Sequence, residues 1–90
     1  VYNYTEDHVF HIFAVQCKER EALKAYCLKN NVHTAIHYPL PPHKQRALKQ
    51  FGKTSLPVTE QLCETVLSLP VSPVQSLEDT HKVIDIINSF

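Results

Sequence analysis

A short apolar stretch leads into a proline-rich segment at residues 34–43, which read TAIHYPLPPH. Each of the three prolines holds φ at about −65° and lacks a backbone N–H, so neither a helix nor a strand ladder continues through them. The residues that precede them are pushed toward extended geometry as well. We therefore predict a rigid, extended loop that leaves the end of a strand and presents His37, Tyr38 and His43 to a ligand or a partner chain.

Outward from this loop, the sequence alternates between strand-like and helix-like patterns. We predict strands at residues 8–17, 32–36 and 67–69, and helices at residues 18–31, 43–51, 57–66 and 76–90. A right-handed crossover makes the first two strands parallel, and the third inserts between them, antiparallel to both. The expected fold class is α+β, a small split βαβ-type sheet of about three strands with helices on one face.

Apolar residues mark the predicted core. The first strand is apolar on both faces, because aromatic and β-branched side chains point to both sides of residues 9–15. Such a strand needs cover on both sides, and we expect the second cover from outside these 90 residues. The last helix begins with the capping box Ser76-x-x-Asp79. Its predicted buried stripe is Val83, Ile84, Ile87 and Phe90.

Composition excludes several classes of protein. A hydrophobic fraction of 43% with 20% charged residues predicts one folded domain, residues 1–90, rather than a disordered chain. Nine basic and nine acidic residues without a charged block argue against a nucleic-acid partner, and no apolar run approaches the ~20 residues that span a bilayer. Three cysteines without Cys-x-x-Cys spacing indicate reduced thiols and a cytoplasmic protein. Because the chain opens at Val1 and holds no methionine, we expect a fragment of a longer protein.

The sequence lacks the common catalytic and metal-binding patterns. His33 and His37 are four residues apart, but along a strand that spacing spans ~13 Å, too far for two imidazoles to share one ion. Neither Cys27 nor Cys63 has a basic neighbour in sequence that would activate its thiol. A single glycine excludes the phosphate-binding glycine motifs. We therefore expect no metal site and no catalytic residue in this chain.

The proline loop and His11 each leave two interpretations open. The loop is either a connection whose side chains pack on the sheet edge, or a site where His37, Tyr38 and His43 donate hydrogen bonds to a polar or anionic ligand. His11, alone in an apolar strand, is either a core histidine with a satisfied ring or a further ligand-binding residue.

Three blocks of sequence occur in a characteristic order. They read HVFHIF at residues 8–13, AIHYPLPPHKQ at residues 35–45 and LSLPVSP at residues 67–73. Together these blocks strongly resemble the C-terminal small domain of the DegT/DnrJ/StrS sugar aminotransferases, and the resemblance covers residues 9–90. It implies the aspartate aminotransferase fold and a pyridoxal-phosphate enzyme that aminates a nucleotide-linked keto-deoxy sugar.

The resemblance implies that part of the active site is missing. In the family, the lysine that binds the cofactor belongs to the large N-terminal domain, in a serine-phenylalanine-histidine type motif that this sequence lacks. Pyridoxal phosphate is therefore expected in the full-length enzyme and not on this chain alone. The family's counterpart of the His37-Tyr38 loop lies beside the active-site cleft. We carry over His37 and Tyr38 as substrate-binding residues, with His43 and His11 as further candidates. Asn31 departs from the family's usual glycine, which asparagine can replace in a turn.

For the full-length enzyme, the resemblance implies a nucleoside-diphosphate keto sugar as amino acceptor and an amino acid, glutamate, as donor. It also implies a homodimer that serves lipopolysaccharide or other cell-surface polysaccharide synthesis. Two alternatives remain: a pyridoxal-phosphate sugar-nucleotide dehydratase on the same fold, with the catalytic lysine replaced, and a free-standing α+β binding module. A residue outside this chain decides the first, and a start at Val1 without methionine argues against the second.

Overall fold

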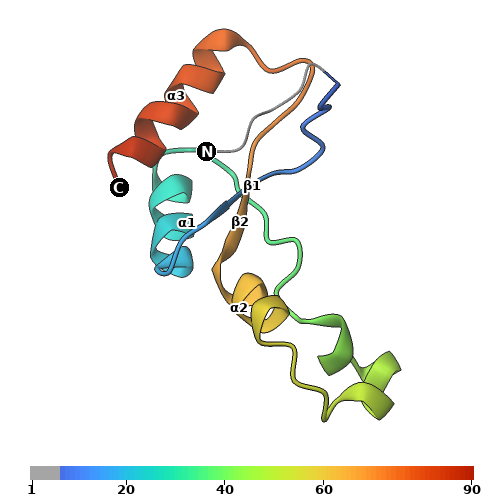
Figure 1. The fold of residues 1–90 in the computed structure, drawn as a ribbon. Helices are drawn as coiled ribbons and strands as arrows, with labels where there is room; N and C mark the ends of the chain where they lie inside the picture. The colour runs from blue at the N-terminus through green and yellow to red at the C-terminus, as the bar shows by residue number, and fades with distance from the viewer. Residues whose placement is uncertain (1–6) are drawn as a thin grey trace.

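Two antiparallel strands form the centre of the fold in the computed structural model, which describes residues 7–90 (Figure 1). Strand β1 (Phe13–Gln16) pairs with strand β2 (Val66–Leu69), so that Phe13 lies opposite Leu69 and Gln16 lies opposite Val66. The antiparallel pairing of the first and last strands agrees with the predicted topology.

The predicted strand at residues 32–36 is reduced to one paired residue. Ala35 forms a single antiparallel bridge with Ser68, through backbone hydrogen bonds of 2.7 and 3.1 Å. β2 therefore lies between β1 and the segment around Ala35, but residues 7–90 contain two strands where about three were predicted. The ladder stays short because the N–H of Val32 bonds to the carbonyl of Cys27, and because the prolines begin at Pro39.

β1 is also shorter than the predicted strand at residues 8–17. Phe10 and Ile12 have φ values of 48° and 66°, in the left-handed region that an extended strand excludes. The chain therefore bends before it enters β1. Among residues 7–90 nothing fully covers the outer side of this region, since Val9 is 84% exposed and Ile12 and Phe13 are 39% and 37% exposed.

Three α-helices follow the predicted order. They are α1 (Arg20–Lys29), α2 (Pro57–Thr65) and α3 (Leu77–Asn88). The N-cap part of the predicted capping box is confirmed, because Ser76 Oγ accepts a hydrogen bond of 3.0 Å from the N–H of Asp79. Asn31 has a φ of 60°, the left-handed conformation that is common just after a helix and that asparagine, in place of the family's glycine, can adopt. No helix within residues 7–90 is long and apolar enough to cross a membrane.

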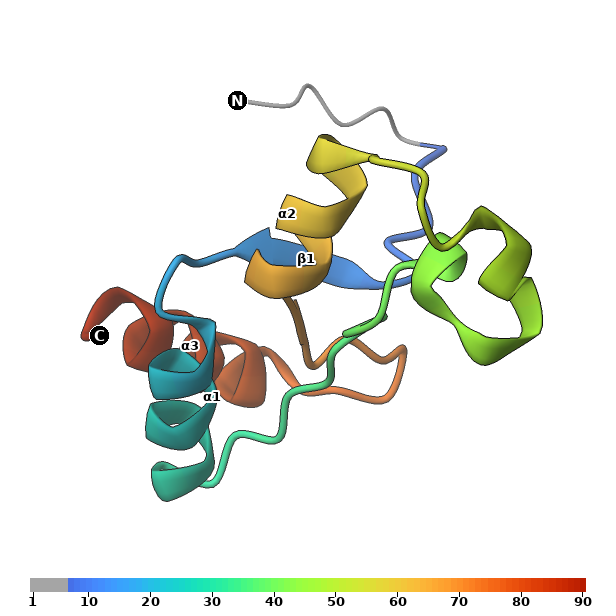
Figure 2. The ribbon, with the colours of Figure 1, turned by 90° about the horizontal axis from the view of Figure 1, so that it is seen from below.

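The predicted helix at residues 43–51 is instead two 3₁₀ segments, Pro42–Lys44 and Arg46–Phe51. Gln45 separates them, because its ψ of 147° is extended and interrupts the helical hydrogen bonds. These segments extend away from α1 and α3 at one end of the molecule, as Figure 2 shows.

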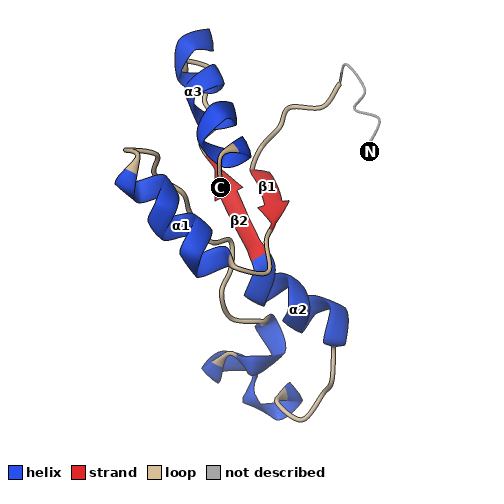
Figure 3. Ribbon diagram, turned by 90° about the vertical axis from the view of Figure 1, so that its left-hand side faces the viewer, coloured by secondary structure: helices blue, strands red, loops and turns tan. Residues whose placement is uncertain are grey.

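The buried core lies between α1 and the sheet. Leu23 and Cys27 of α1 pack with Val32 and with Leu67 of β2, and none of the four is more than 4% exposed. α1 and α3 lie on the same side of the two strands (Figure 3), so the helical cover of the sheet is one-sided. The predicted placement of helices on one face agrees with this arrangement.

α3 contributes a different stripe from the predicted one. Val83 and Ile87 are half-buried against the core, as predicted. The prediction is wrong for Ile84 and Phe90, which are 47% and 48% exposed, and Ile86 packs on the core instead. The difference arises because the tertiary contact with α1 selects which side of α3 is buried.

Candidate functional site

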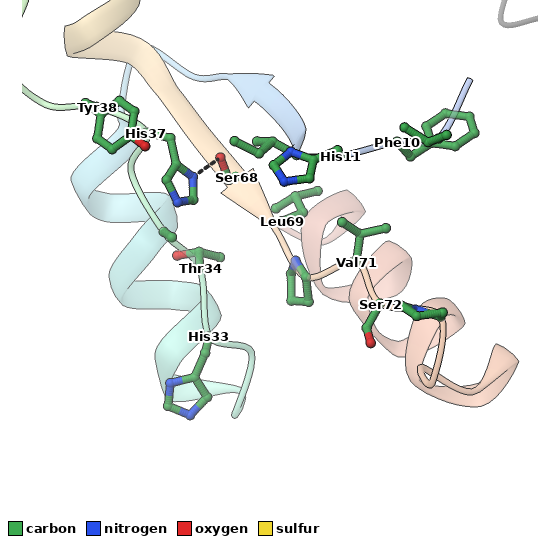
Figure 4. A pocket seen from close by; sticks show the side chains of 15 residues that line it. Phe10, His11, His33, Thr34, His37, Tyr38, Ser68, Leu69, Val71 and Ser72 are labelled. Atoms are coloured by element: carbon green, nitrogen blue, oxygen red, sulfur yellow. Dashed lines mark hydrogen bonds between the residues drawn. The ribbon is translucent and has the colours of Figure 1, made fainter. Parts of the chain in front are cut away.

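An open pocket of about 1020 Å³ lies where the end of β2, the proline loop and the segment before β1 meet (Figure 4). Its lining comes from three parts of the chain, residues 9–12, residues 33–38 without Ile36, and residues 68–73. Three of the four predicted substrate-binding residues, His37, Tyr38 and His11, lie together here. His11 and His37 are far apart in the sequence, and the fold brings them together because both lie next to β2.

A hydrogen bond to the strand beneath it holds His37 at this pocket. Nδ1 of His37 lies 2.9 Å from Oγ of Ser68, and the backbone of Ser68 is itself bonded to Ala35. The ring of His37 meets the ring of Tyr38 edge-on, with ring centroids 5.4 Å apart. Tyr38 is 68% exposed, so its ring and hydroxyl are open to a ligand.

His11 reaches the pocket from the other side of β2. Figure 4 shows His11 and His37 on opposite sides of this strand, which pairs with β1 on one edge and with Ala35 on the other. His11 is exposed among residues 7–90, so it is not part of the core that these residues form. Its imidazole is available to the same ligand as that of His37.

The sequence predictions missed four polar residues of this pocket, His33, Thr34, Ser68 and Ser72. His33 lies four residues before His37, and along an extended segment an even spacing places both side chains on one face. That spacing was the signal that could have found His33. Ser68 gave no such signal, because only the pairing of β2 with Ala35 shows which segment its hydroxyl faces.

The pocket contains no formal charge while its histidines are neutral. Its lining holds three histidines and the hydroxyls of Thr34, Tyr38, Ser68 and Ser72, but no aspartate, glutamate, lysine or arginine from residues 7–90. An apolar wall with a few polar groups suits an organic ligand that is fixed by hydrogen bonds. Because no lysine lines this pocket, its residues do not fit pyridoxal phosphate, which enzymes hold through a lysine amine.

His43, the fourth predicted residue, lies outside this pocket. Its side chain is 4% exposed, and its Nε2 lies 2.8 Å from Oε1 of Glu60 on α2. A carboxylate only accepts hydrogen bonds, so Nε2 of His43 donates. Nδ1 is buried without a hydrogen-bond partner among the described residues. His43 therefore joins the proline loop to α2 and does not line the pocket.

No thiol of the chain lines the pocket. Cys27 is 0% exposed, and burial raises the pKa of its thiol, which keeps it protonated and unreactive near neutral pH. Cys17 and Cys63 are half-buried. Within residues 7–90, no three side chains of the histidine, cysteine, aspartate or glutamate type are grouped so that they could hold a metal ion. The chemistry that the pocket itself offers is hydrogen bonding and orientation.

The hydrogen bond between His43 and Glu60 predicts that the free energy of unfolding depends on pH in the acid range. The N–H of Leu56 and then the hydrogen bond from His43 lower the pKa of Glu60 below its ordinary value of 4.5. A carboxyl whose pKa is lowered by folding stabilises the fold above its unfolded pKa, and this contribution is lost as the pH falls through the lowered value. We expect Glu60→Gln to lower the free energy of unfolding at neutral pH, and to lower it progressively less in acid.

Urea titrations across the acid range measure this difference. Glu64→Gln is the matched control, because Glu64 is an exposed carboxylate on the same helix, and it should keep the pH dependence of the unmodified chain. An unchanged pH dependence in Glu60→Gln would show that the carboxylate contributes nothing through ionisation.

Comparisons with known proteins identify the family. The model of the DegT/DnrJ/EryC1/StrS aminotransferase family matches residues 2–88. The dTDP-3-amino-3,6-dideoxy-alpha-D-galactopyranose transaminase of Aneurinibacillus thermoaerophilus is 46% identical over 83 residues, which are 92% of this chain and 23% of that protein. The UDP-N-acetyl-3-dehydro-alpha-D-glucosamine 3-aminotransferase of Acidithiobacillus ferrooxidans is 38% identical over 80 residues, 89% of this chain and 22% of that protein.

A solved structure has the same fold. The crystal structure of a DegT DnrJ EryC1 StrS aminotransferase from Brucella abortus aligns with a TM-score of 0.79 and 32% identity, over 87% of this chain and 21% of that chain. The chain thus spans just over a fifth of the length of the relatives it matches. The resemblance carried by the three sequence blocks is confirmed, and the chain belongs to the DegT/DnrJ/EryC1/StrS aminotransferase family.

Proposed function

We propose that residues 1–90 are the C-terminal small domain of a sugar-nucleotide aminotransferase whose large N-terminal domain binds the cofactor. Family membership and the transaminase names of two relatives support this proposal. The exposed apolar side chains of Val9, Ile12 and Phe13 support it further, because they form a surface that a second domain can cover. The chain matches only a small share of the length of these relatives, and this also supports the proposal of a second domain.

The proposed reaction moves the amino group of an amino acid, glutamate in this proposal, to the keto carbon of a nucleoside-diphosphate-linked keto-deoxy sugar. The donor becomes its oxo acid, and the acceptor becomes an amino sugar for lipopolysaccharide or another cell-surface polysaccharide. Pyridoxal phosphate, held by the large domain, supplies the amino-transfer chemistry. We place the enzyme in the cytoplasm as a homodimer.

The convergence of His37, Tyr38 and His11 on one pocket is the observation that carries this proposal. Their side chains offer hydrogen bonds to the hydroxyl and phosphate oxygens of a sugar nucleotide, and the exposed ring of Tyr38 offers a flat apolar contact. These contacts orient the sugar relative to the reacting centre, which is how residues without catalytic chemistry raise a rate. In this proposal His43 stabilises the same loop through its hydrogen bond to Glu60.

The visible absorption spectrum of the full-length protein, recorded before and after borohydride, tests the assignment. We expect a band of bound pyridoxal phosphate that borohydride removes, and peptide mapping should place the reduced cofactor on a lysine outside the sequence of this chain. Bound cofactor without a lysine adduct would contradict the aminotransferase and favour the dehydratase. A full-length protein that binds no cofactor would contradict both enzymes.

A further inference from the structure

Ser68 is buried at a position where its hydroxyl has one partner. The residue is 5% exposed, and its backbone N–H and carbonyl are both bonded to Ala35, at 2.7 and 3.1 Å. Among residues 7–90, the only hydrogen-bond partner of the hydroxyl is Nδ1 of His37, at 2.9 Å (Figure 4). The bond joins a buried strand residue to an exposed residue of the pocket.

The proton balance of this pair distinguishes the two neutral forms of His37. A serine hydroxyl has one proton to donate, and a neutral imidazole has one N–H and one nitrogen with a free lone pair. If Nδ1 carried the proton, it would donate to Ser68, and the buried hydroxyl proton would have no acceptor among the described residues. If Nε2 carries the proton, the hydroxyl donates to Nδ1 and both groups are satisfied. A buried donor without an acceptor is costly, so the second form is favoured.

We propose that Ser68 is a positioning residue that holds His37 in its Nε2–H tautomer. His37 is exposed at the pocket, and none of the described residues hydrogen-bonds its Nε2. The pocket therefore presents an N–H donor at this place. The ligand atom that matches it is a hydrogen-bond acceptor, such as a hydroxyl, keto or phosphate oxygen.

This inference rests on the proposed function and deepens it, because it states which chemical group the pocket takes at His37. A protonated amine offers only donors and finds no acceptor on an Nε2–H imidazole. The pocket thus favours an oxygen of the sugar nucleotide at this position and disfavours an ammonium group, whether that of the amino-acid donor or that of an amino-sugar product.

Nuclear magnetic resonance of the full-length enzyme, labelled with ¹⁵N at histidine, measures the tautomer directly. The two ring nitrogens have different ¹⁵N shifts according to which one carries the proton, and His37→Gln identifies the signals of His37. At a pH of about 8, where an ordinary imidazole is neutral, we expect Nε2 to be protonated and Nδ1 to be free. Ser68→Ala should mix the two tautomers, and Ser68→Thr, which keeps a hydroxyl, should restore the single form. An Nδ1–H tautomer in the unmodified enzyme would overturn the proposal.

Steady-state kinetics of the same variants test the consequence for binding. Loss of one oriented hydrogen bond is expected to raise the KM for the sugar nucleotide about two- to tenfold in Ser68→Ala, with kcat and the KM for the amino donor nearly unchanged. Ser68→Thr should return the KM toward its original value. Ser55→Ala, at an exposed position before α2, is the control for loss of a serine hydroxyl. An unchanged KM in Ser68→Ala would overturn the positioning role, while the cofactor spectrum and the proposed function would stand.

Discussion

Replacing Leu67 with alanine is expected to lower the free energy of unfolding by about 2–5 kcal/mol, the largest effect on stability that we expect from one substitution. Leu67 is 0% exposed and packs in the core with Leu23, Cys27 and Val32. Truncation removes buried methyl groups and leaves a cavity that the surrounding helix and strand fill only in part. Small domains are stable by about 5–15 kcal/mol, so this loss is a large share of the total. Urea unfolding followed by circular dichroism measures it.

Leu77→Ala is the matched control, because Leu77 is 79% exposed at the start of α3. A substitution on the surface is expected to change the free energy of unfolding by no more than about 0.5 kcal/mol. Equal losses at the two positions would contradict the placement of the core between α1 and β2.

Leu67 also links the core to the pocket, because successive residues of a strand point to opposite faces. Leu67 packs on α1, while the next residue, Ser68, turns its hydroxyl to His37. The register of β2 therefore fixes both sets of contacts at once. A shift of one residue would place a leucine against His37 and a serine in the core, so burial of Leu67 specifies the geometry of the pocket.

Local signals in the sequence predicted the three α-helices, but not the two 3₁₀ segments at residues 42–51. The N-cap at Ser76 and the left-handed Asn31 depend on residues close in sequence, and both are present in the structure. The strands were predicted less well, because their lengths depend on distant partners. The positive φ of Phe10 and Ile12, which delays the start of β1 to Phe13, occurs at residue types that rarely adopt it. No sequence pattern predicts such a backbone conformation.

The sequence predicted the candidate site about as well as it predicted the fold: some residues correctly, others not. The proline loop marked His37 and Tyr38, and the apolar first strand marked His11, and these three residues line one pocket. The location of His43 was not predictable, because it depends on Glu60, which lies 17 residues later on α2. Ser68 was missed for the same physical reason, since its partner His37 is 31 residues away. Local patterns identified the loop, and tertiary pairing decided which of its side chains face the pocket.

If the full-length protein is the proposed aminotransferase, His37→Ala is expected to raise its KM for the sugar nucleotide about 10- to 100-fold. A hydrogen bond to a charged group contributes about 1.5–3 kcal/mol, and each 1.4 kcal/mol is about tenfold in affinity. The KM for the amino-acid donor should change little, because the Nε2–H of His37 disfavours an ammonium group. Steady-state kinetics with each substrate varied in turn measures both constants.

Two further variants separate this role of His37 from a general loss of structure. His81→Ala is the matched control, because His81 is an exposed histidine of α3 that does not line the pocket. Tyr38→Phe, which loses only a hydroxyl, should raise the KM for the sugar nucleotide less than His37→Ala does. An equal rise in the two KM values of His37→Ala would place His37 at a contact shared by both substrates. That result would contradict a position on the sugar-nucleotide side of the pocket.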